Sequence, residues 1–162
     1  MPQRPPGSTL ESSTEPSLLA TTQRSHLCGA LRRAHAGTRV RLAGWVHRSR
    51  DLGGLLFMDL RDREGRVQVS FDPKWAAADV IAAAAAAGVE SVVLVEGTVA
   101  ERPEQMRNAD LATGDVEVHA TSFRVVGPAV TPAIPVARGK GEKLPAEELR
   151  LRHRYLDLRR PE

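Results

Sequence analysis

Five segments of the chain carry alternating or β-branched hydrophobic residues, and this pattern is typical of β-strands. The segments are residues 39–50, 55–61, 66–71, 91–99 and 115–126. The Gly53–Gly54 pair and residues 63–65 are turn signals between the first three. Gly44, inside the first segment, offers a position for the bulge that a strongly coiled strand needs. The pattern predicts three strands in a meander, followed later by two more.

An alanine-rich segment, residues 74–87, separates the third predicted strand from the fourth and favours a helix. Asp72 is suited to cap this helix, Pro73 to occupy its first position and Gly88 to end it. Three meandering strands, one helix and two further strands follow the order of elements in an OB-fold, a small five-stranded barrel. We therefore predict a mainly β protein: a five-stranded OB-fold barrel with a helix between strands 3 and 4, followed by a linker and a short C-terminal helix.

The composition of the chain changes on both sides of the predicted barrel, which we place at residues 25–126. Residues 1–24 are rich in Pro, Ser and Thr without apolar periodicity, so we predict a disordered tail. Residues 127–145 are rich in Pro and Gly and predict a linker. Residues 146–160 predict a helix, because their acidic residues come first and two arginines come last, as the helix dipole favours. We expect a second domain to begin there.

The charge of the chain is distributed unevenly, although its net value is only +3. Residues 32–66 contain nine arginines against four acidic residues, whereas residues 67–126 contain four basic residues against nine acidic ones. A basic region beside an acidic one produces a field that steers a polyanion to one edge. Arginine also pairs bidentately with phosphate. The alternative to a polyanion-binding surface is that the many arginines reflect only a GC-rich genome.

The composition excludes several classes of protein. No run approaches the roughly 18–20 apolar residues that a membrane span needs, so we expect no membrane insertion. A single cysteine, Cys28, excludes an internal disulfide framework and fits a reducing compartment. The five histidines lack metal-ligand spacing, and the chain has no glycine-rich phosphate loop. Cys28 with His26 is too little for a nucleophile and its base. We therefore predict no catalytic residue and no metal site.

Strand parity places an aromatic ring and an amide on the polar face of the predicted barrel. Met58 faces the core with its second neighbours, so Phe57 points outward. By the same rule Gln68 and Ser70 point outward from the third strand. A base stacks on an exposed aromatic ring with a gain of about 1–3 kcal/mol, and an amide offers one donor and one acceptor to a base edge. Phe57 and Gln68 are candidate base-binding residues; packing of Phe57 under the linker or another domain is the alternative.

Charged residues flank this face. Arg48 and Arg50 end the first strand and are candidates for contacts with phosphates or bases. Ion pairs with Asp51 or Asp59 are the alternative for both arginines. Glu117 in the fifth strand can accept a hydrogen bond from a base amino group, or it is simply a solvated strand residue.

Four blocks of the sequence resemble the N-terminal anticodon-binding domain of bacterial aspartyl-tRNA synthetases, which are class II enzymes. The blocks are SHLCGAL at 25–31, GWVHRSRDLGGLLFMDLRDREG at 44–65, LATGDVEV at 111–118 and LRHRYLDLRRP at 151–161. The second block is long and specific, and the resemblance covers residues 24–162. The last block is similar to the family's entry into its catalytic domain, so residues 146–162 are expected to be the truncated start of that domain.

The resemblance implies that the domain grips the anticodon stem-loop of tRNA-Asp, with tRNA-Asn left open as a second partner. By similarity, Phe57 stacks on the central uridine and Gln68 hydrogen-bonds its edge, while two arginines hold the loop. Asn108 and Glu117 lie where the family contacts an outer anticodon base. The implied tRNA-binding residues are Arg48, Arg50, Phe57, Gln68, Asn108 and Glu117.

The same resemblance implies ATP-dependent attachment of aspartate to tRNA by a longer, cytoplasmic and homodimeric enzyme that uses ATP and Mg. The class II catalytic motifs are absent from these residues. We therefore expect this chain to bind tRNA without catalysing the reaction and to need no cofactor of its own.

Three alternatives stay open. Asparaginyl- and lysyl-tRNA synthetases share this barrel and the central anticodon base, so Phe57 and Gln68 do not separate the three enzymes. A free-standing module for single-stranded nucleic acid is a second reading, and an inert gene fragment is a third. By resemblance, Leu52 favours an enzyme restricted to tRNA-Asp.

Overall fold

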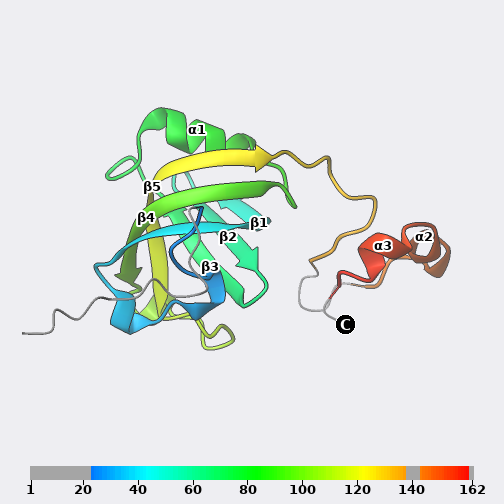
Figure 1. Ribbon diagram of the computed structural model, residues 1–162, viewed down its shortest axis with the longest axis horizontal. Coiled ribbons are helices and arrows are strands. Elements are labelled where there is room, and N and C mark those ends of the chain that lie inside the picture. The colour runs from blue at the N-terminus through cyan, green and yellow to red at the C-terminus, as the bar shows by residue number, and fades with distance from the viewer. Residues whose placement is uncertain (1–22, 138–142, 161–162) are drawn as a thin grey trace, which may run out of the picture.

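The computed structural model describes residues 23–137 and 143–160 of the chain. Five strands close into a barrel in the order β1, β2, β3, β5, β4 (Figure 1). Their bounds are β1 Arg39–Asp51, β2 Leu56–Asp62, β3 Gly65–Phe71, β4 Val92–Glu101 and β5 Val116–Gly127. Helix α1 (Ala78–Ala86) lies between β3 and β4. The predicted OB-fold barrel is confirmed. Nearly all of the predicted tail, residues 1–24, and residues 138–142 of the predicted linker lie outside the described residues.

Four of the five strand pairings in the barrel are antiparallel, and the pairing of β3 with β5 is parallel. β1 pairs with β4 up to Trp45 and with β2 from Trp45 onward, so it must coil between the two partners. Its register with β2 shifts between Val46 and Arg48, which places the bulge at His47. The expectation of a bulge at Gly44 was therefore wrong. Gly44 instead permits a close approach of strands, because a Cβ there would lie 2.4 Å from the Arg61 carbonyl oxygen.

The barrel interior is filled by the alternate residues of the strands. The inward-facing side chains of β2 and β3 are at most 4% exposed, namely Leu56, Met58, Leu60, Val67, Val69 and Phe71. Phe71 meets Phe123 of β5 edge to face, with ring centroids 5.6 Å apart. The predicted alternation holds in both strands with one exception. Ser70, which we expected outside, is buried.

The segment after β3 departs from the predicted helix. We expected a helix from residue 74, but α1 begins at Ala78. The Asp72 carboxylate accepts a hydrogen bond from the Lys74 amide at 2.9 Å, and the Asp72 carbonyl accepts from the amides of Trp75 and Ala76. Asp72 therefore caps a separate turn. In that turn the Trp75 indole donates to the Ser70 carbonyl at 3.2 Å, a local bond that precedes the helix.

Three short 3-10 helices complete the barrel domain: η1 (Cys28–Ala30), η2 (Arg33–His35) and η3 (Glu104–Met106). η1 packs on the barrel, and Cys28 is fully buried in the core cluster. The Cys28 amide donates to the Asp62 carboxylate at 2.6 Å. Burial, reinforced by the nearby Asp62 carboxylate, raises the pKa of the Cys28 thiol well above its ordinary value. Cys28 is therefore a protonated core residue.

Residues 146–160 form two short helices instead of the single predicted one, α2 (Glu147–Arg152) and α3 (Arg154–Asp157). The break falls at His153, whose ψ of 44° lies outside the helical region. Figure 1 shows both helices beside the barrel. Arg159, which follows α3, connects this segment to the barrel domain by donating to the Glu90 carboxylate at 2.7 Å. Among the described residues, no helix is long and apolar enough to cross a membrane.

Candidate nucleic-acid interface

The outer surface of β1, β2, β3 and β5 carries two rows of side chains, which we call the outer face. Residues paired across neighbouring strands share one side of the sheet, so the strand register defines each row. The first row contains Arg50, Phe57, Ser70 and His119. The second row contains Arg48, Asp59, Gln68 and Glu117. Five of the six residues proposed from the sequence therefore lie on one surface.

Phe57 lies on this outer face between Arg50 of β1 and Ser70 of β3. Its side chain is partly exposed, whereas its neighbours Leu56 and Met58 are buried. The ring is therefore outside the core, as strand parity predicted. The base-stacking role of Phe57 stays a prediction.

A chain of polar contacts holds the Gln68 amide. Arg50 Nη2 lies 3.2 Å from Asp59 Oδ1 and donates to Gln68 Oε1 at 3.3 Å. Gln68 Nε2 donates to Glu117 Oε2 at 2.8 Å. A guanidinium only donates and a carboxylate only accepts, so the two partners define a single orientation of the amide. The ion pair of Arg50 with Asp59, weighed above as an alternative to ligand contact, is present in the structure.

The contacts continue from Glu117 to two aromatic residues that were not among the candidates predicted from the sequence. Glu117 Oε1 lies 3.0 Å from His119 Nε2 and accepts from Ser70 Oγ at 3.4 Å. The His119 ring stacks on the Trp75 indole, with centroids 3.9 Å apart and planes 8° from parallel. His119 was recognisable, since it follows Glu117 by two positions on the same strand. Trp75 was not, because its segment was assigned to a helix.

A buried arginine lies close to the second row. Arg102 is 6% exposed, and its Nε donates to the Val116 carbonyl at 3.0 Å. Its Nη2 is buried without a hydrogen-bond partner among the described residues. Burial lowers the pKa of Arg102, and the charges of Glu117 and Asp59 oppose this shift. Nothing in the strand pattern marked Arg102, because it follows the end of β4.

A second charged cluster adjoins the outer face at the bulge of β1. Arg61 Nη1 lies 3.1 Å from His47 Nδ1, and Arg66 Nη1 lies 2.9 Å from His47 Nε2. Burial, followed by the charges of Arg66 and Arg61, lowers the pKa of His47 and favours the neutral ring. Arg61 also pairs with the buried Glu90 carboxylate at 2.9 Å. Because Glu90 binds Arg159 too, this cluster connects β2 to the C-terminal segment.

Two of the candidate residues lie apart from the network of contacts. Arg48 is exposed at the edge of the outer face, opposite Asp59. Asn108 lies in the loop between β4 and β5, where its side-chain oxygen accepts from the Asp110 amide at 3.0 Å. The structure thus joins Arg50, Gln68 and Glu117 and gives Asn108 a partner within its own loop.

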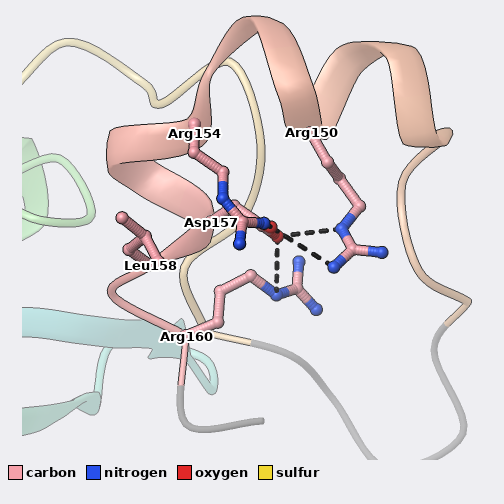
Figure 2. Close-up of a pocket in the computed structure, with 5 residues that line it drawn as sticks. All are labelled: Arg150, Arg154, Asp157, Leu158 and Arg160. Atoms are coloured by element: carbon pink, nitrogen blue, oxygen red, sulfur yellow. Dashed lines mark hydrogen bonds and ion pairs between the residues drawn. The ribbon is translucent and has the colours of Figure 1, made fainter.

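A pocket in the C-terminal segment is lined by Arg150, Arg154, Asp157, Leu158 and Arg160 (Figure 2). The Asp157 carboxylate accepts from Arg150 Nε at 2.9 Å and from Arg154 Nη1 at 2.7 Å. The hydrogen bond from Arg150 is the main reason that the pKa of Asp157 is lowered. The pair with Arg150 ties α2 to α3, whereas the pair with Arg154 lies within α3. Within residues 23–137 and 143–160, no group of His, Cys, Asp or Glu side chains is placed to hold a metal ion.

Comparison with known proteins identifies a matching family and relatives of this chain. A family model described as an OB-fold nucleic acid binding domain matches residues 40–126. The chain is 51% identical over 138 residues to an aspartate–tRNA(Asp/Asn) ligase from Rubrobacter xylanophilus and 50% identical over 137 residues to one from Azorhizobium caulinodans. Each match covers 85% of this chain and 22% of the relative.

A solved structure shares the architecture as well. The crystal structure of asparaginyl-tRNA synthetase from Pyrococcus horikoshii matches with a TM-score of 0.68 and 29% identity. The match covers 84% of this chain and 30% of that chain. The chain therefore spans about a fifth of the length of the curated relatives and under a third of the solved one.

Proposed function

The chain belongs to the OB-fold nucleic acid binding domain family, and from this premise we propose that its outer face binds the anticodon loop of a tRNA. The curated relatives, which are aspartate–tRNA(Asp/Asn) ligases, support tRNA as the partner. The strands 2–3 face is also the surface with which OB-folds bind oligonucleotides.

The oriented amide of Gln68 beside the Phe57 ring is the observation that carries this proposal. Gln68 directs Oε1 toward Arg50 and Nε2 toward Glu117, and each atom retains hydrogen-bonding capacity beyond these contacts. A uridine edge offers one donor and one acceptor, which an amide can match. Phe57 lies on the neighbouring strand, one row away. In our proposal the base of the central nucleotide stacks on Phe57 while its edge meets Gln68.

The arginines of β1 supply the charge that a phosphate backbone requires. Arg48 is exposed at the rim of the outer face. Arg50 is partly exposed, and its Nε is buried without a hydrogen-bond partner in the described part of the chain. A buried donor without an acceptor costs about 1–3 kcal/mol, so a new acceptor that draws Arg50 outward would recover part of this energy. We propose that Arg48 and Arg50 contact the loop backbone or its bases.

Glu117 and Asn108 are proposed to contact an outer base of the anticodon. Glu117 already accepts from Gln68 and Ser70, and it retains lone pairs for a base amino group. Asn108 is exposed on the loop that precedes β5, where its side-chain oxygen already accepts from the Asp110 amide. We therefore rank Glu117 before Asn108 in this role.

The decisive experiment is a titration of the 162-residue chain with an anticodon stem-loop RNA that carries a central uridine. Phe57→Ala is expected to weaken binding by about 1–3 kcal/mol, because it removes the stacking surface. Tyr155→Ala is the matched control, since Tyr155 is an exposed aromatic residue on α3, outside the barrel. Equal affinity of the wild type and Phe57→Ala for this RNA would refute the proposed site.

For the whole protein we propose the activity of the curated relatives. This activity is ATP-dependent aspartylation of tRNA, with Mg, by a cytoplasmic homodimer, and residues 146–162 form the start of its catalytic domain. The chain spans only about a fifth of the length of these relatives. Purified chain that shows aspartate-dependent pyrophosphate exchange would contradict the expectation that this part only binds.

The names of the relatives raise a second question, namely whether this chain also binds tRNA-Asn. The anticodons for aspartate and asparagine differ only at their third base, which is C or U. We propose that this chain prefers the anticodon loop of tRNA-Asp. The reason is Leu52, which by resemblance favours an enzyme restricted to tRNA-Asp. Competition between the two loops measures the preference directly, and equal affinity would indicate a partner set like that in the relatives' names.

A further inference from the structure

We infer that Trp75 and His119 form a second base-stacking platform, which holds the nucleotide next to the one on Phe57. The inference rests on the proposed function and extends it to residues for which neither the strand pattern nor the relatives assigned a role. Trp75 belongs to the turn after β3 and His119 to β5, so the platform forms only in the folded barrel.

Both rings lie outside the core of the barrel. Neither Trp75 nor His119 belongs to the buried core cluster or to the residues packed against it. Trp75 is partly exposed, and the His119 side chain is 30% exposed. An aromatic pair on a polar surface leaves apolar area in water, and such area is typical of binding sites.

The two rings are held by their edges. The indole N–H of Trp75 donates to the Ser70 carbonyl at 3.2 Å, and Nε2 of His119 lies 3.0 Å from the Glu117 carboxylate. Their planes are 8° from parallel and their centroids are 3.9 Å apart. Edge contacts fix the rings in place without using the outer faces of the pair. A preorganised aromatic surface loses little side-chain entropy when a base stacks on it.

The spacing between the platform and Phe57 suits the bases of two consecutive nucleotides. Phe57, Ser70 and His119 are register partners on three neighbouring strands, so Phe57 and His119 are two strand spacings, or about 10 Å, apart. The residue between them is Ser70, whose side chain is short and buried. No large side chain of that row separates the two aromatic surfaces. Two consecutive nucleotides with splayed bases can therefore use one surface each.

The charges around the platform suit a nucleotide as well. Glu117 binds Gln68 through one carboxylate oxygen and His119 through the other, so the same side chain joins both base positions. Lys74, which precedes Trp75, is exposed and can meet a phosphate. A base on the platform would thus have an aromatic face beneath it, a carboxylate beside it and a cation at the rim.

The first test uses the fluorescence of Trp75. The chain contains two tryptophans, Trp45 and Trp75, so Trp45→Phe leaves Trp75 as the only one. Saturation of that variant with the central-uridine stem-loop is expected to quench its emission, because a stacked base quenches an indole. Unchanged emission at saturation would overturn the inference.

The second test measures coupling between Trp75 and individual nucleotides. Trp75→Leu keeps an apolar side chain without a ring, and it is expected to weaken binding about tenfold. Trp75→Phe retains a ring and is the matched control, expected within about threefold of wild type. With an abasic nucleotide on one side of the central uridine, the loss caused by Trp75→Leu should vanish. A loss that stays the same with every abasic loop would show that Trp75 acts only on the fold, and thermal melts of both variants measure that effect.

The outcomes separate this inference from the proposed function. If Phe57→Ala and an abasic central nucleotide weaken binding while Trp75→Leu does not, the function stands and the platform is wrong. If the wild-type chain does not bind the stem-loop at all, the proposed function fails and the inference fails with it.

Discussion

Replacing Glu117 with glutamine is expected to reduce the proposed preference of the outer face for a central uridine over a central cytidine. In the native structure, Gln68 Nε2 donates to Glu117 Oε2 at 2.8 Å, and Gln68 Oε1 accepts from Arg50 Nη2 at 3.3 Å. The shorter of these contacts is the one that involves the carboxylate. Because a carboxylate can only accept, it prevents the amide of Gln68 from turning over.

The magnitude follows from the two base edges. Uridine presents an N–H donor and a carbonyl acceptor, and cytidine presents an acceptor and an amino donor in their place. An amide fixed in one orientation therefore matches one pyrimidine and opposes the other, which is worth about 1–3 kcal/mol of discrimination. The introduced glutamine amide can accept or donate, so only the longer contact with Arg50 still orients Gln68. A hydrogen bond to a charged group exceeds a neutral one by roughly 1 kcal/mol, so the uridine preference should fall about fivefold.

The assay is fluorescence anisotropy with two stem-loops that differ only in the central pyrimidine. The ratio of the two dissociation constants is the relevant quantity, because removal of a negative charge should strengthen binding of both RNAs. Glu101→Gln is the matched control, since Glu101 pairs with Arg33 at 2.8 Å, away from the outer face. If Glu117→Gln and wild type give the same ratio, Glu117 does not orient Gln68, and the account of uridine recognition fails.

Three further predictions concern stability, salt and pH. Met58→Ala should lower the free energy of unfolding by about 2–5 kcal/mol, because Met58 is fully buried, whereas Phe57→Ala should change it far less; urea denaturation of both variants checks this. Arg48→Ala should weaken RNA binding and reduce the slope of log K against log salt by nearly one, while Arg39→Ala, at the other end of β1, should leave the slope unchanged. Since the pKa of His47 is lowered in the folded state, the unfolded chain binds more protons just below the ordinary value of 6.5, so stability should decrease as the pH falls through this range. His47→Gln should diminish that decrease in urea titrations at pH 7.5 and pH 5, and an unchanged pH dependence would exclude His47 as a contributor.

The local patterns of the sequence predicted the barrel and the direction of its outward side chains. The two-residue period of a strand is a property of that strand alone, so Phe57 and Gln68 could be placed outside the core without knowledge of their neighbours. The bulge at His47 could not be located in this way, since it depends on where β1 changes its partner from β4 to β2. Gly44 is a residue type that suits a bulge, but in the structure it allows the close approach of β1 to the Arg61 carbonyl of β2.

The contacts between distant segments were beyond reach of the sequence. The pairing of Gln68 with Glu117 joins residues 49 positions apart, and no local pattern specifies that register. Trp75 shows the opposite problem, because the helix-forming residues after it favoured a longer helix. In the structure its indole donates to the Ser70 carbonyl from a turn that precedes the helix, and Ser70, which parity had placed outside, is buried.

The parallel pairing of β3 with β5 has a consequence for folding and ligand linkage. Like the pairing of β1 with β4, it unites segments that lie far apart in the chain, so its formation carries a loop-closure entropy that the β2–β3 hairpin does not. Non-local pairings of this kind are intrinsically slow to form. Gln68 and Ser70 lie on one side of this seam, and Glu117 and His119 on the other. The proposed base-binding surface is therefore completed only when β3 and β5 pair. An RNA that spans the seam opposes its opening, and at a hundredfold excess over its dissociation constant it adds about 2.7 kcal/mol to the stability of the closed state.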